Sequence, residues 1–337
     1  MFRLMTNNEG FTAMAEPLGL RVKRVVHSLR DDSAWRIARF LRDDARDRAA
    51  VTPVVSDDPV AGSYRNDVVT LDDADPDDFP AVIFQTWKSR SVIPGNYRHW
   101  RQTFVDTNPD CRVLLWDDAD NRAFIADRFA WALPVYDSYP QEIFRADAVR
   151  FFFLLEFGGL YADMDTECLR PIRPSASTGA VVLCRMGGNP DFAHAIPNAI
   201  MASRPSQIFW LFAIHRMIEA AERIPDAAAR IAAGPETMTG PVLLKQAYDA
   251  FVALDEAAVM VVLAPLLAKL TERQRTRLRY ARPTLLDGRI WYPLDWTNMF
   301  HKRLCNRLRT DRRILPIEVG RTLFPDAAVV TYWSHSW

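Results

Sequence analysis

Cysteine is scarce in this sequence, and long apolar runs are missing from it. The 337 residues include only four cysteines, none of them in a Cys-x-x-Cys pair, so neither a zinc site nor a disulfide framework is indicated. No stretch of about 18 apolar residues occurs, and residues 1 to 20 lack the apolar core of a secretion signal. We therefore expect a protein of a reducing compartment, with neither a membrane span nor a standard secretion signal.

An excess of charge of either sign is also absent. Lys and Arg number 42, as do Asp and Glu, so bulk electrostatics give no reason to expect nucleic acid as a partner. A Gly-rich phosphate loop, a Walker pattern and a Ser-His-Asp order are missing as well. Hydrophobic residues make up 49% of the chain, enough for one large domain or two small ones with a well-buried core.

The first 79 residues differ in character from the rest. Residues 17 to 50 have the apolar spacing of a charged amphipathic helix or helix pair, which we expect to pack on the main domain. Docking to a membrane surface or a partner is the alternative, against which the acidic residues of the segment argue. Residues 52 to 79 are rich in Asp and Pro and are typical of an exposed linker. We expect a helical extension and linker at 1–79 and one domain at 80–337.

From Pro80 onward, segments typical of strands and of helices alternate. We expect strands at 81–86, 112–116, 160–163, 181–184 and 327–332, and helices at 96–106, 121–129, 141–157, 208–221 and 242–252. Such alternation predicts an α/β fold in which helices cover both faces of a parallel-rich sheet. Ligands of such sheets bind outside the carboxyl ends of the strands, where Trp87 and Asp163 are expected to lie.

Two carboxylates follow the strand expected at 160–163. Asp163 and Asp165 can point to one site only if the strand ends there and Met164 turns beneath them. A strand end of this kind offers oxygen ligands to Mg²⁺ or Mn²⁺, which commonly take one or two protein carboxylates and complete their shell with phosphate oxygens and water. Asp-x-Asp is also frequent in solvated turns, so the pair alone does not identify a metal site.

The helix before this strand carries two opposite charges among Phe and Leu. Asp147 and Arg150 stand one helical turn apart, and the helix ends at Gly158-Gly159, a pair that permits a left-handed cap and an immediate reversal. The reversal would bring the charged helix face and the carboxylates toward one site. On the residues alone, an ion pair on the solvated side of the helix explains the two charges equally well.

One pattern runs through both features, Arg145-Ala146-Asp147-x-x-Arg150-(x)₇-Gly158-Gly159-x-Tyr161-x-Asp163-x-Asp165. It resembles the sugar-binding region of the DXD glycosyltransferases, family 32 in particular, which includes yeast mannosyltransferases, and it is similar to that of the large clostridial glucosylating toxins. Further motifs extend the resemblance to about residues 80 to 337, namely Phe84-Gln85-Thr86-Trp87-Lys88, Asn108-Pro109-Asp110 and Leu115-Trp116-Asp117-Asp118. Where the family often has His and Tyr, this chain has Phe84 and Phe151, which look like packing exchanges.

The resemblance implies the GT-A fold, a Rossmann-like nucleotide-sugar domain with a mixed sheet. It implies a retaining hexosyltransferase that uses a UDP- or GDP-sugar, Mn²⁺ or Mg²⁺, and a glycan, lipid-linked glycan or protein acceptor. It also implies roles for single residues: Trp87 near the nucleobase, Asp147 and Arg150 on sugar hydroxyls, Tyr161 in the pocket wall, Asp163 on the ribose and donor sugar, Asp163, Asp165 and His335 at the metal, Asn198 near the reacting centre, and Ser336 and Trp337 at the diphosphate.

Several of these assignments have ordinary alternatives. Asn198 fits a helix cap equally well, and a histidine as near the end of the chain as His335 is often merely exposed. The turn at 234–241 can bring a side chain to an acceptor or simply begin the next helix. The other five histidines have no ligand-like spacing and are expected to be structural: His27, His99, His194, His215 and His301.

We expect an enzyme that builds a cell-envelope glycan such as capsule or lipopolysaccharide, in the cytoplasm or at the inner face of the membrane. A translocated toxin that glycosylates a host protein is the alternative within the same family. A metal-dependent phosphohydrolase and a non-catalytic glycan-binding relative are the alternatives from other classes. A hydrolase is expected to have a denser carboxylate cluster, and a decayed site is expected to lose its metal ligands first.

Overall fold

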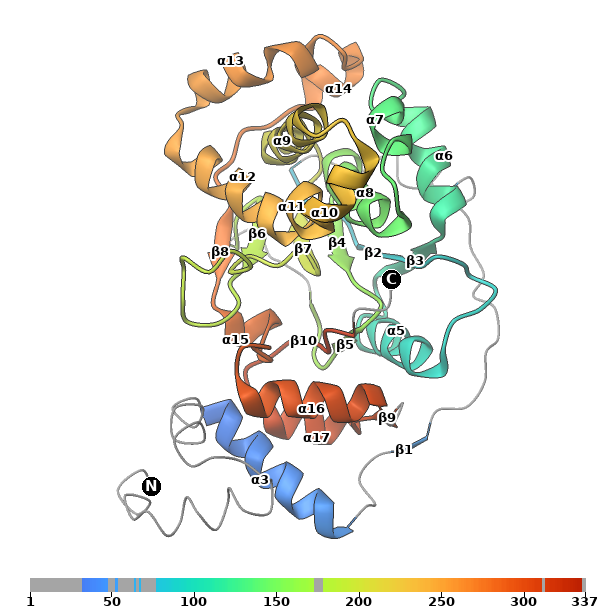
Figure 1. The fold of residues 1–337 in the computed structure, drawn as a ribbon, viewed down its shortest axis with the longest axis vertical. Helices are drawn as coiled ribbons and strands as arrows, with labels where there is room; N and C mark the ends of the chain where they lie inside the picture. Colours follow the sequence, from blue (N-terminus) through green and yellow to red (C-terminus); the bar gives the residue numbers. More distant parts are fainter. Residues whose placement is uncertain are drawn as a thin grey trace.

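A six-stranded sheet forms the centre of the computed structural model, which describes residues 32–47, 52–53, 64, 67, 77–172, 178–310 and 313–334 (Figure 1). The strand order is β3-β2-β4-β7-β6-β8, with β2 at Val82–Thr86, β3 at Arg112–Trp116, β4 at Gly159–Ala162, β6 at Val181–Cys184, β7 at Ile200–Ser203 and β8 at Thr284–Leu286. β7 runs against its neighbours β4 and β6, and the other three pairings are parallel. The expected α/β class with a mixed, mainly parallel sheet is confirmed.

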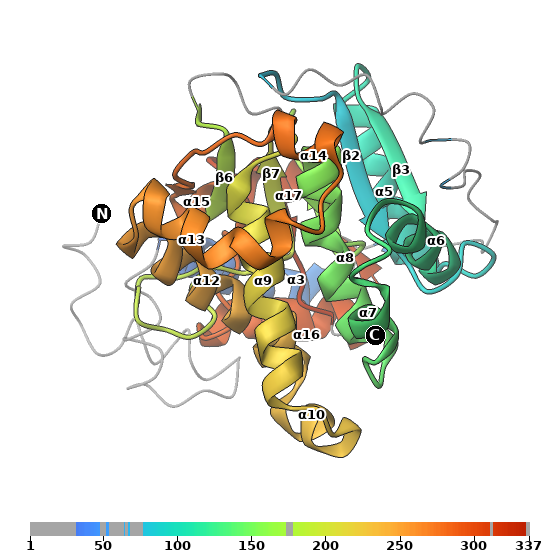
Figure 2. The same cartoon turned by 90° about the horizontal axis from the view of Figure 1, so that it is seen from above.

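Helices cover both faces of this sheet, as alternate side chains of β2 show. Phe84 belongs to a large apolar cluster shared with α6 (Asp118–Arg128), α8 (Glu142–Glu156) and α9 (Ile208–Arg223), whereas Ile83 packs with Phe104 of α5 (Gly95–Thr107). Apart from α3, the other helices of the described residues are α7 (Leu133–Asp137), α10 (Ala227–Ala233), α11 (Pro235–Met238), α12 (Pro241–Ala253), α13 (Glu256–Leu267), α14 (Glu272–Arg277), α15 (Gly288–Trp291), α16 (Met299–Thr310) and α17 (Ile317–Leu323). Seen from above, α10 extends past the end of α9, away from the sheet (Figure 2).

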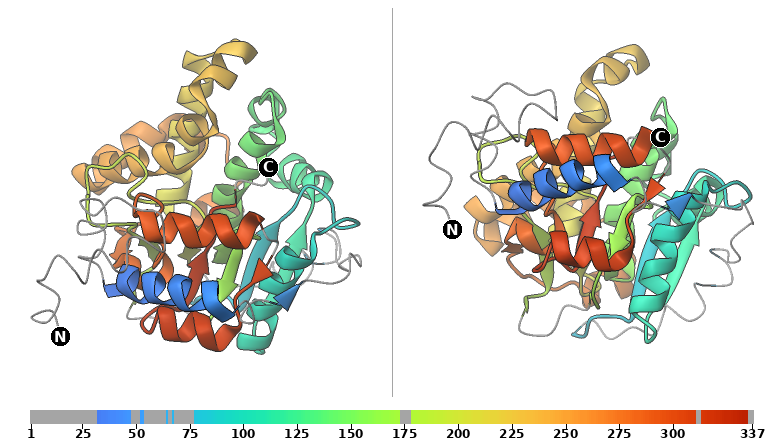
Figure 3. Two further views of the ribbon diagram at one scale, coloured as in Figure 1. Left: turned by 60° about the horizontal axis from the view of Figure 1, so that its bottom comes forward. Right: turned by 90° about the horizontal axis from the view of Figure 1, so that it is seen from below.

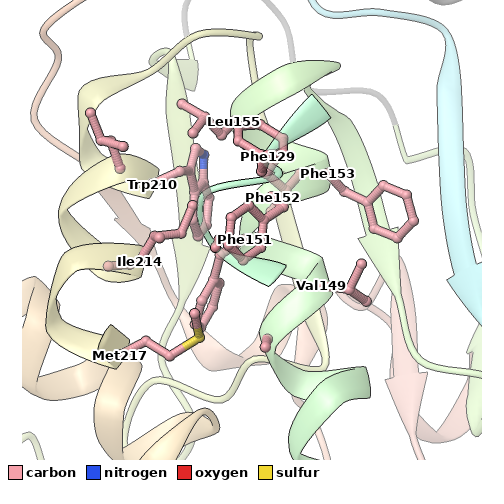
Figure 4. Packing of buried hydrophobic residues seen from close by; sticks show 14 of the residues in the cluster. Phe129, Val149, Phe151, Phe152, Phe153, Leu155, Trp210, Ile214 and Met217 are labelled. Carbon is pink, nitrogen blue, oxygen red and sulfur yellow. The ribbon is translucent and has the colours of Figure 1, made fainter. Parts of the chain in front are cut away.

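Helix α8 is apolar on almost every side because it packs between α9 and the sheet. Phe151 lies against Trp210 of α9, with ring centroids 6.0 Å apart, while Phe153 points the other way and stacks on Phe84 of β2 at 4.3 Å (Figure 4). Phe84 and Phe151 are fully buried. Both are therefore packing side chains of the core.

The described part of the N-terminal extension is one helix, α3 (Asp32–Asp47), which lies beside α16 and α17 (Figure 3). Ala34, Ile37 and Leu41 are buried in a cluster with Leu304 and Leu323 of those two helices. The expectation that this segment packs on the main domain is confirmed for 32–47, and its remaining residues lie outside the described ones. Burial of one apolar face explains the amphipathic pattern.

The predicted linker differs from expectation at its two described single residues. Tyr64 is buried, its ring stands edge-on to Trp116 at 4.9 Å, and its hydroxyl donates to Asp127 at 2.6 Å. Asp67 accepts a hydrogen bond from the indole N–H of Trp116 at 2.9 Å. Both residues therefore contact Trp116 of the sheet. The sequence analysis had predicted an exposed linker here.

A second, two-stranded sheet brings the end of the described chain to the end of β4. β5 (Thr166–Cys168) pairs antiparallel with β10 (Val329–Thr331), so Tyr332 to Ser334 pass beside Asp165. The other short pair joins β1 (Thr52–Pro53) to β9 (Arg313–Ile314). Among the helices of the described residues, none combines the length and apolarity that a membrane span requires.

Candidate active site

Two glycines turn the chain from α8 into β4. Gly158 and Gly159 have φ angles of +65° and +85°, as the sequence pattern predicted. A Cβ on Gly158 would lie 2.5 Å from the backbone nitrogen of Pro205, and one on Gly159 would lie 2.7 Å from the carbonyl oxygen of Val82. A side chain would force the backbone apart at either position, so only glycine fits. The turn thereby holds α8 directly against the strand that ends at the two carboxylates.

Arg150 is the centre of a buried polar network. Its Nη2 lies 2.8 Å from Oδ1 of Asp147 and 3.2 Å from Oδ1 of Asp163, and only 3% of its side chain is exposed. Nη1 donates to the carbonyl of Asn198 at 2.9 Å, and Nε donates to the carbonyl of Ala146 at 3.1 Å. The guanidinium thus joins helix, strand end and loop. A solvated surface ion pair, the alternative for Asp147 and Arg150, does not describe this geometry.

Asp147 is held from two sides. Besides Arg150, the side-chain amide of Asn198 donates to its Oδ1 at 3.0 Å. Burial raises the pKa of Asp147, while the Arg150 guanidinium and the Asn198 amide lower it. Asn198 stands in the loop before β7, so the alternative of a helix cap does not apply to it.

β4 ends at Ala162, and the chain then turns at Asp163 and Asp165 as predicted. The hydroxyl of Tyr161, which is fully buried, donates to Oδ1 of Asp163 at 2.7 Å, so Tyr161 lies beneath Asp163 instead of in the pocket wall where it was expected. Burial raises the pKa of Asp163 to about 7 against the lowering effect of Arg150, although 22% of the side chain remains exposed. This carboxylate therefore changes charge near neutral pH.

Asp165 is tied to the last described segment. Its Oδ2 accepts hydrogen bonds from the backbone N–H and the hydroxyl of Ser334, at 2.7 and 2.9 Å. Its Oδ1 has no hydrogen-bond partner among the described residues. One oxygen thus anchors the chain after β10, and the other is available to a ligand.

A cavity of about 380 Å³ opens over this network at the carboxyl ends of β2 and β4. Six of the residues predicted for the site line it: Trp87, Asp147, Arg150, Asp163, Asp165 and Asn198. Trp87 is 2% exposed, and its indole N–H donates to the carbonyl of Val92 at 3.0 Å. The remaining predicted residues, His335, Ser336 and Trp337, lie outside the described ones.

Other residues of the lining were not among the predicted site residues. His194, Trp296 and Trp333 line the cavity with Met186 and Glu236. Glu236 lies in the turn at 234–241. For this turn the sequence left two interpretations open, contact with an acceptor and the start of the next helix. No motif surrounds His194 or Trp296, which reach the cavity from loops more than 100 residues apart in the sequence. The position of Trp333 could have indicated a site residue, because it directly follows the last predicted strand.

Asp163 and Asp165 suit a hard divalent cation because both are oxygen donors that face the cavity. Within the described ranges, no three His, Cys, Asp or Glu side chains gather into a metal site. Two carboxylates are nevertheless enough protein ligands for Mg²⁺ or Mn²⁺ when diphosphate and water complete the coordination shell. The residues present therefore fit a metal that arrives with a phosphorylated ligand.

Comparison with known proteins bears on the same segment. Residues 94–181 match the family model described as "Glycosyltransferase sugar-binding region containing DXD motif". The predicted resemblance to the DXD glycosyltransferases is confirmed. Arg150, Asp163 and Asp165 all lie within the matched residues.

Curated relatives match part of the chain. Inositol phosphoceramide mannosyltransferase 3 of Schizosaccharomyces pombe is 38% identical over 120 residues, which are 33% of this chain and 33% of the relative. Inositol phosphoceramide mannosyltransferase 2 of the same yeast is 43% identical over 89 residues, 26% of each chain. Mannosyl phosphorylinositol ceramide synthase SUR1 of Saccharomyces cerevisiae is 31% identical over 154 residues, 44% of this chain and 38% of the relative. The chain thus spans well under half the length of each of these relatives.

Among solved structures, the PaToxG glycosyltransferase aligns with 60% of this chain and 84% of its own. The TM-score is 0.41 and the sequence identity 15%. At these values the alignment carries no argument about substrate or mechanism.

Proposed function

We propose that this protein is a metal-dependent, retaining glycosyltransferase that transfers a hexose from a UDP- or GDP-sugar. One observation carries the proposal: a single buried guanidinium, that of Arg150, joins Asp147 and Asp163 in a cavity that Asp165 also lines. Burying two carboxylates and an arginine costs free energy of folding. A role of these side chains in ligand binding would explain why the protein tolerates this cost. The matched DXD region and the mannosyltransferase names of the relatives support the same reaction class.

The charged side chains Asp147, Arg150 and Asp163 have the chemistry needed to hold a donor sugar. Asp147 and Asp163 are acceptors, and the guanidinium of Arg150 is a donor, so together they can bind sugar hydroxyls in a fixed orientation. Asn198 and Tyr161 donate to the two carboxylates and hold them in place. Such positioning reduces the entropic part of the barrier before any bond changes.

The leaving group of the proposed reaction is a nucleoside diphosphate. Asp165 and Asp163 would hold the divalent ion, which when bound neutralises negative charge on the diphosphate. Trp87 is proposed for the nucleobase, and His335, Ser336 and Trp337 are proposed for the metal and diphosphate. The retaining outcome is part of the proposal and comes from the family resemblance.

The acceptor proposed is a cell-envelope glycan or lipid-linked glycan, met in the cytoplasm or at the inner face of the membrane. The named substrates of the yeast relatives, inositol phosphoceramides, are lipid-linked, which supports an acceptor of this kind. Modification of a host protein is the alternative, and transfer to a peptide would favour it.

Nucleotide release from a panel of UDP- and GDP-sugars, with Mn²⁺ present, tests the proposal. We expect release of UDP or GDP from at least one donor, together with free or transferred sugar. Liberation of inorganic phosphate instead would identify a phosphohydrolase. Binding of a sugar nucleotide without turnover, in the presence of glycan acceptors, would identify a non-catalytic relative.

A further inference from the structure

Three aromatic rings in mutual contact line the same cavity as Arg150, and together we call them the shelf. The shelf consists of Trp333, Trp296 and His194, all of which line the cavity. The Trp333 and Trp296 rings are 6.5 Å apart and tilted by 34°, and the His194 ring stands edge-on to Trp296 at 5.3 Å. Tyr292 stacks behind Trp333 at 5.7 Å and is itself buried. The shelf therefore rests on the core.

Trp333 is held in an unfavourable backbone conformation. Its φ of +51° lies in the left-handed region, which a bulky side chain rarely adopts. Hydrogen bonds on both sides enforce it: the N–H of Tyr332 donates to the carbonyl of Asp165 at 2.9 Å, and the N–H of Ser334 donates to its carboxylate at 2.7 Å. The Trp333 indole N–H is bound to the carbonyl of Leu294 at 2.8 Å. The backbone that carries the ring is thus fixed beside Asp165, and the ring itself is held by Leu294 and Tyr292.

Glu236 lies near both His194 of the shelf and Asp147 of the charged network. Burial lowers the pKa of His194, and the nearby Glu236 carboxylate opposes this. Glu236 also lies close enough to Asp147 to add to the larger effect of burial in raising its pKa. The cavity is therefore lined both by carboxylates with a guanidinium and by aromatic rings.

We propose that the shelf of Trp333, Trp296 and His194 is the acceptor subsite and that it binds a six-membered polyol ring, that of a sugar or of inositol. This inference rests on the proposed function. An apolar face of C–H groups on such a ring can lie on Trp296, while its hydroxyls remain free to meet Glu236 and the donor sugar. The ring would lie between the shelf and the sugar-binding side chains, where an attacking hydroxyl is needed.

The arrangement favours an acceptor ring over the other flat ligand of the reaction, the nucleobase. Trp87 follows β2, whereas the shelf comes from the segments that follow β6, α15 and β10. Trp333 is attached through Ser334 to Asp165, where the diphosphate would sit, and Glu236 stands beside Asp147 at the sugar end. The shelf is therefore connected to both proposed donor contacts, the diphosphate at Asp165 and the sugar at Asp147, and the acceptor must reach the space between them.

Acceptor titration with two variants of Trp296 tests the proposal. Trp296→Leu keeps an apolar side chain but removes the flat face, and Trp296→Phe restores an aromatic face. With the preferred donor and either methyl α-mannopyranoside or myo-inositol, we expect Trp296→Leu to raise the acceptor KM about five- to tenfold and Trp296→Phe to recover most of the loss. The donor KM should change much less. The two polyols distinguish a sugar ring from an inositol ring.

A matched control is Trp131→Leu, because Trp131 is also half-buried but packs on Phe129 and Phe152 away from the cavity. Equal acceptor KM values for wild type and Trp296→Leu, or transfer to a Ser/Thr/Tyr peptide but to neither polyol, would overturn the subsite. If no donor is turned over, the proposed function fails. Binding of the polyol ring is then measured separately, by NMR saturation transfer from the protein to each polyol. The acceptor subsite predicts that this signal is lost in Trp296→Leu and kept in Trp131→Leu.

Discussion

At the scale of single residues, Arg150 connects three elements through one planar group. It contacts Asp147 on α8, Asp163 after β4 and the carbonyl of Asn198 before β7. A lysine ammonium carries the same charge but is a compact point donor without the planar fork. The geometry of the guanidinium is therefore more important here than its charge, and two substitutions separate these contributions.

We predict that Arg150→Lys lowers nucleotide release at least about 100-fold, a typical cost of losing one transition-state contact. Arg150→Ala should in addition destabilise the fold by about 3–5 kcal/mol, because it leaves buried carboxylates without their cation. Release rates and thermal unfolding measure the two effects. The control is Arg122→Lys, since Arg122 forms an exposed two-point contact with Asp137 at 2.9 and 2.7 Å, where little change is expected. Near-normal release by both Arg150 variants would contradict a role in donor binding.

The pKa of Asp163 leads to a prediction about pH. Since burial raises this pKa to about 7, the carboxylate takes up a proton as the pH falls through 7, and nucleotide release at limiting Mn²⁺ should fall with it. A bound cation competes with the proton, so a higher Mn²⁺ concentration should move the midpoint to lower pH. Tyr161→Phe removes a hydrogen bond that lowers this pKa and should move the midpoint to higher pH. Identical profiles under all three conditions would exclude Asp163 as the titrating group.

At the scale of elements, the turn between α8 and β4 determines where the charged side chains meet. We predict that Gly158→Ala and Gly159→Ala each destabilise the fold by at least about 2 kcal/mol, from an unfavourable φ and backbone overlap together. Gly188→Ala is the control, because Gly188 has no atom within 4 Å of the added Cβ and no positive φ. Denaturant unfolding measures the differences. Equal stabilities of the three variants would show that the turn tolerates side chains.

Elements were predictable where local sequence decides them. The apolar run of α8 followed by two glycines and a short strand was read with its correct order, and α5, β3 and α9 lie within two residues of expectation. Tyr64 was missed because its partner, Trp116, is 52 positions away and no local pattern announces the contact. The family resemblance placed Tyr161 in the pocket wall, and the sequence alone does not say which side a strand residue faces.

At the scale of the whole molecule, the charged half of the cavity was predictable and the aromatic half was not. Asp147, Arg150, Asp163 and Asp165 fall within 19 consecutive residues, so one motif reveals them. His194, Trp296 and Trp333 meet only after the sheet and the loops around β10 have assembled. Long-range packing of this kind leaves no spacing to recognise in the sequence.

The N-terminal helix contributes to the same assembly. Leu41 of α3 is 1% exposed and belongs to the apolar cluster that contains Trp87 and Met164, two residues of the cavity. We predict that Leu41→Ala lowers the free energy of unfolding by about 2–5 kcal/mol, because it leaves a void in this cluster. Val261→Ala, at a 75% exposed position of α13, should change it by less than about 0.5 kcal/mol. Equal effects in urea unfolding would show that α3 is only loosely attached.

The central claim is that Asp163 and Asp165 hold a divalent ion against the diphosphate of a sugar donor. The most direct test is nucleotide release by wild type and Asp165→Asn, each with Mn²⁺ and with excess EDTA. Asn keeps an oxygen that can accept the hydrogen bonds from Ser334, so the fold should survive while one cation ligand is weakened. We predict Mn²⁺-dependent release by wild type, with a loss of at least about 100-fold both in EDTA and in the variant. Full turnover in excess EDTA, or by Asp165→Asn, would contradict the account.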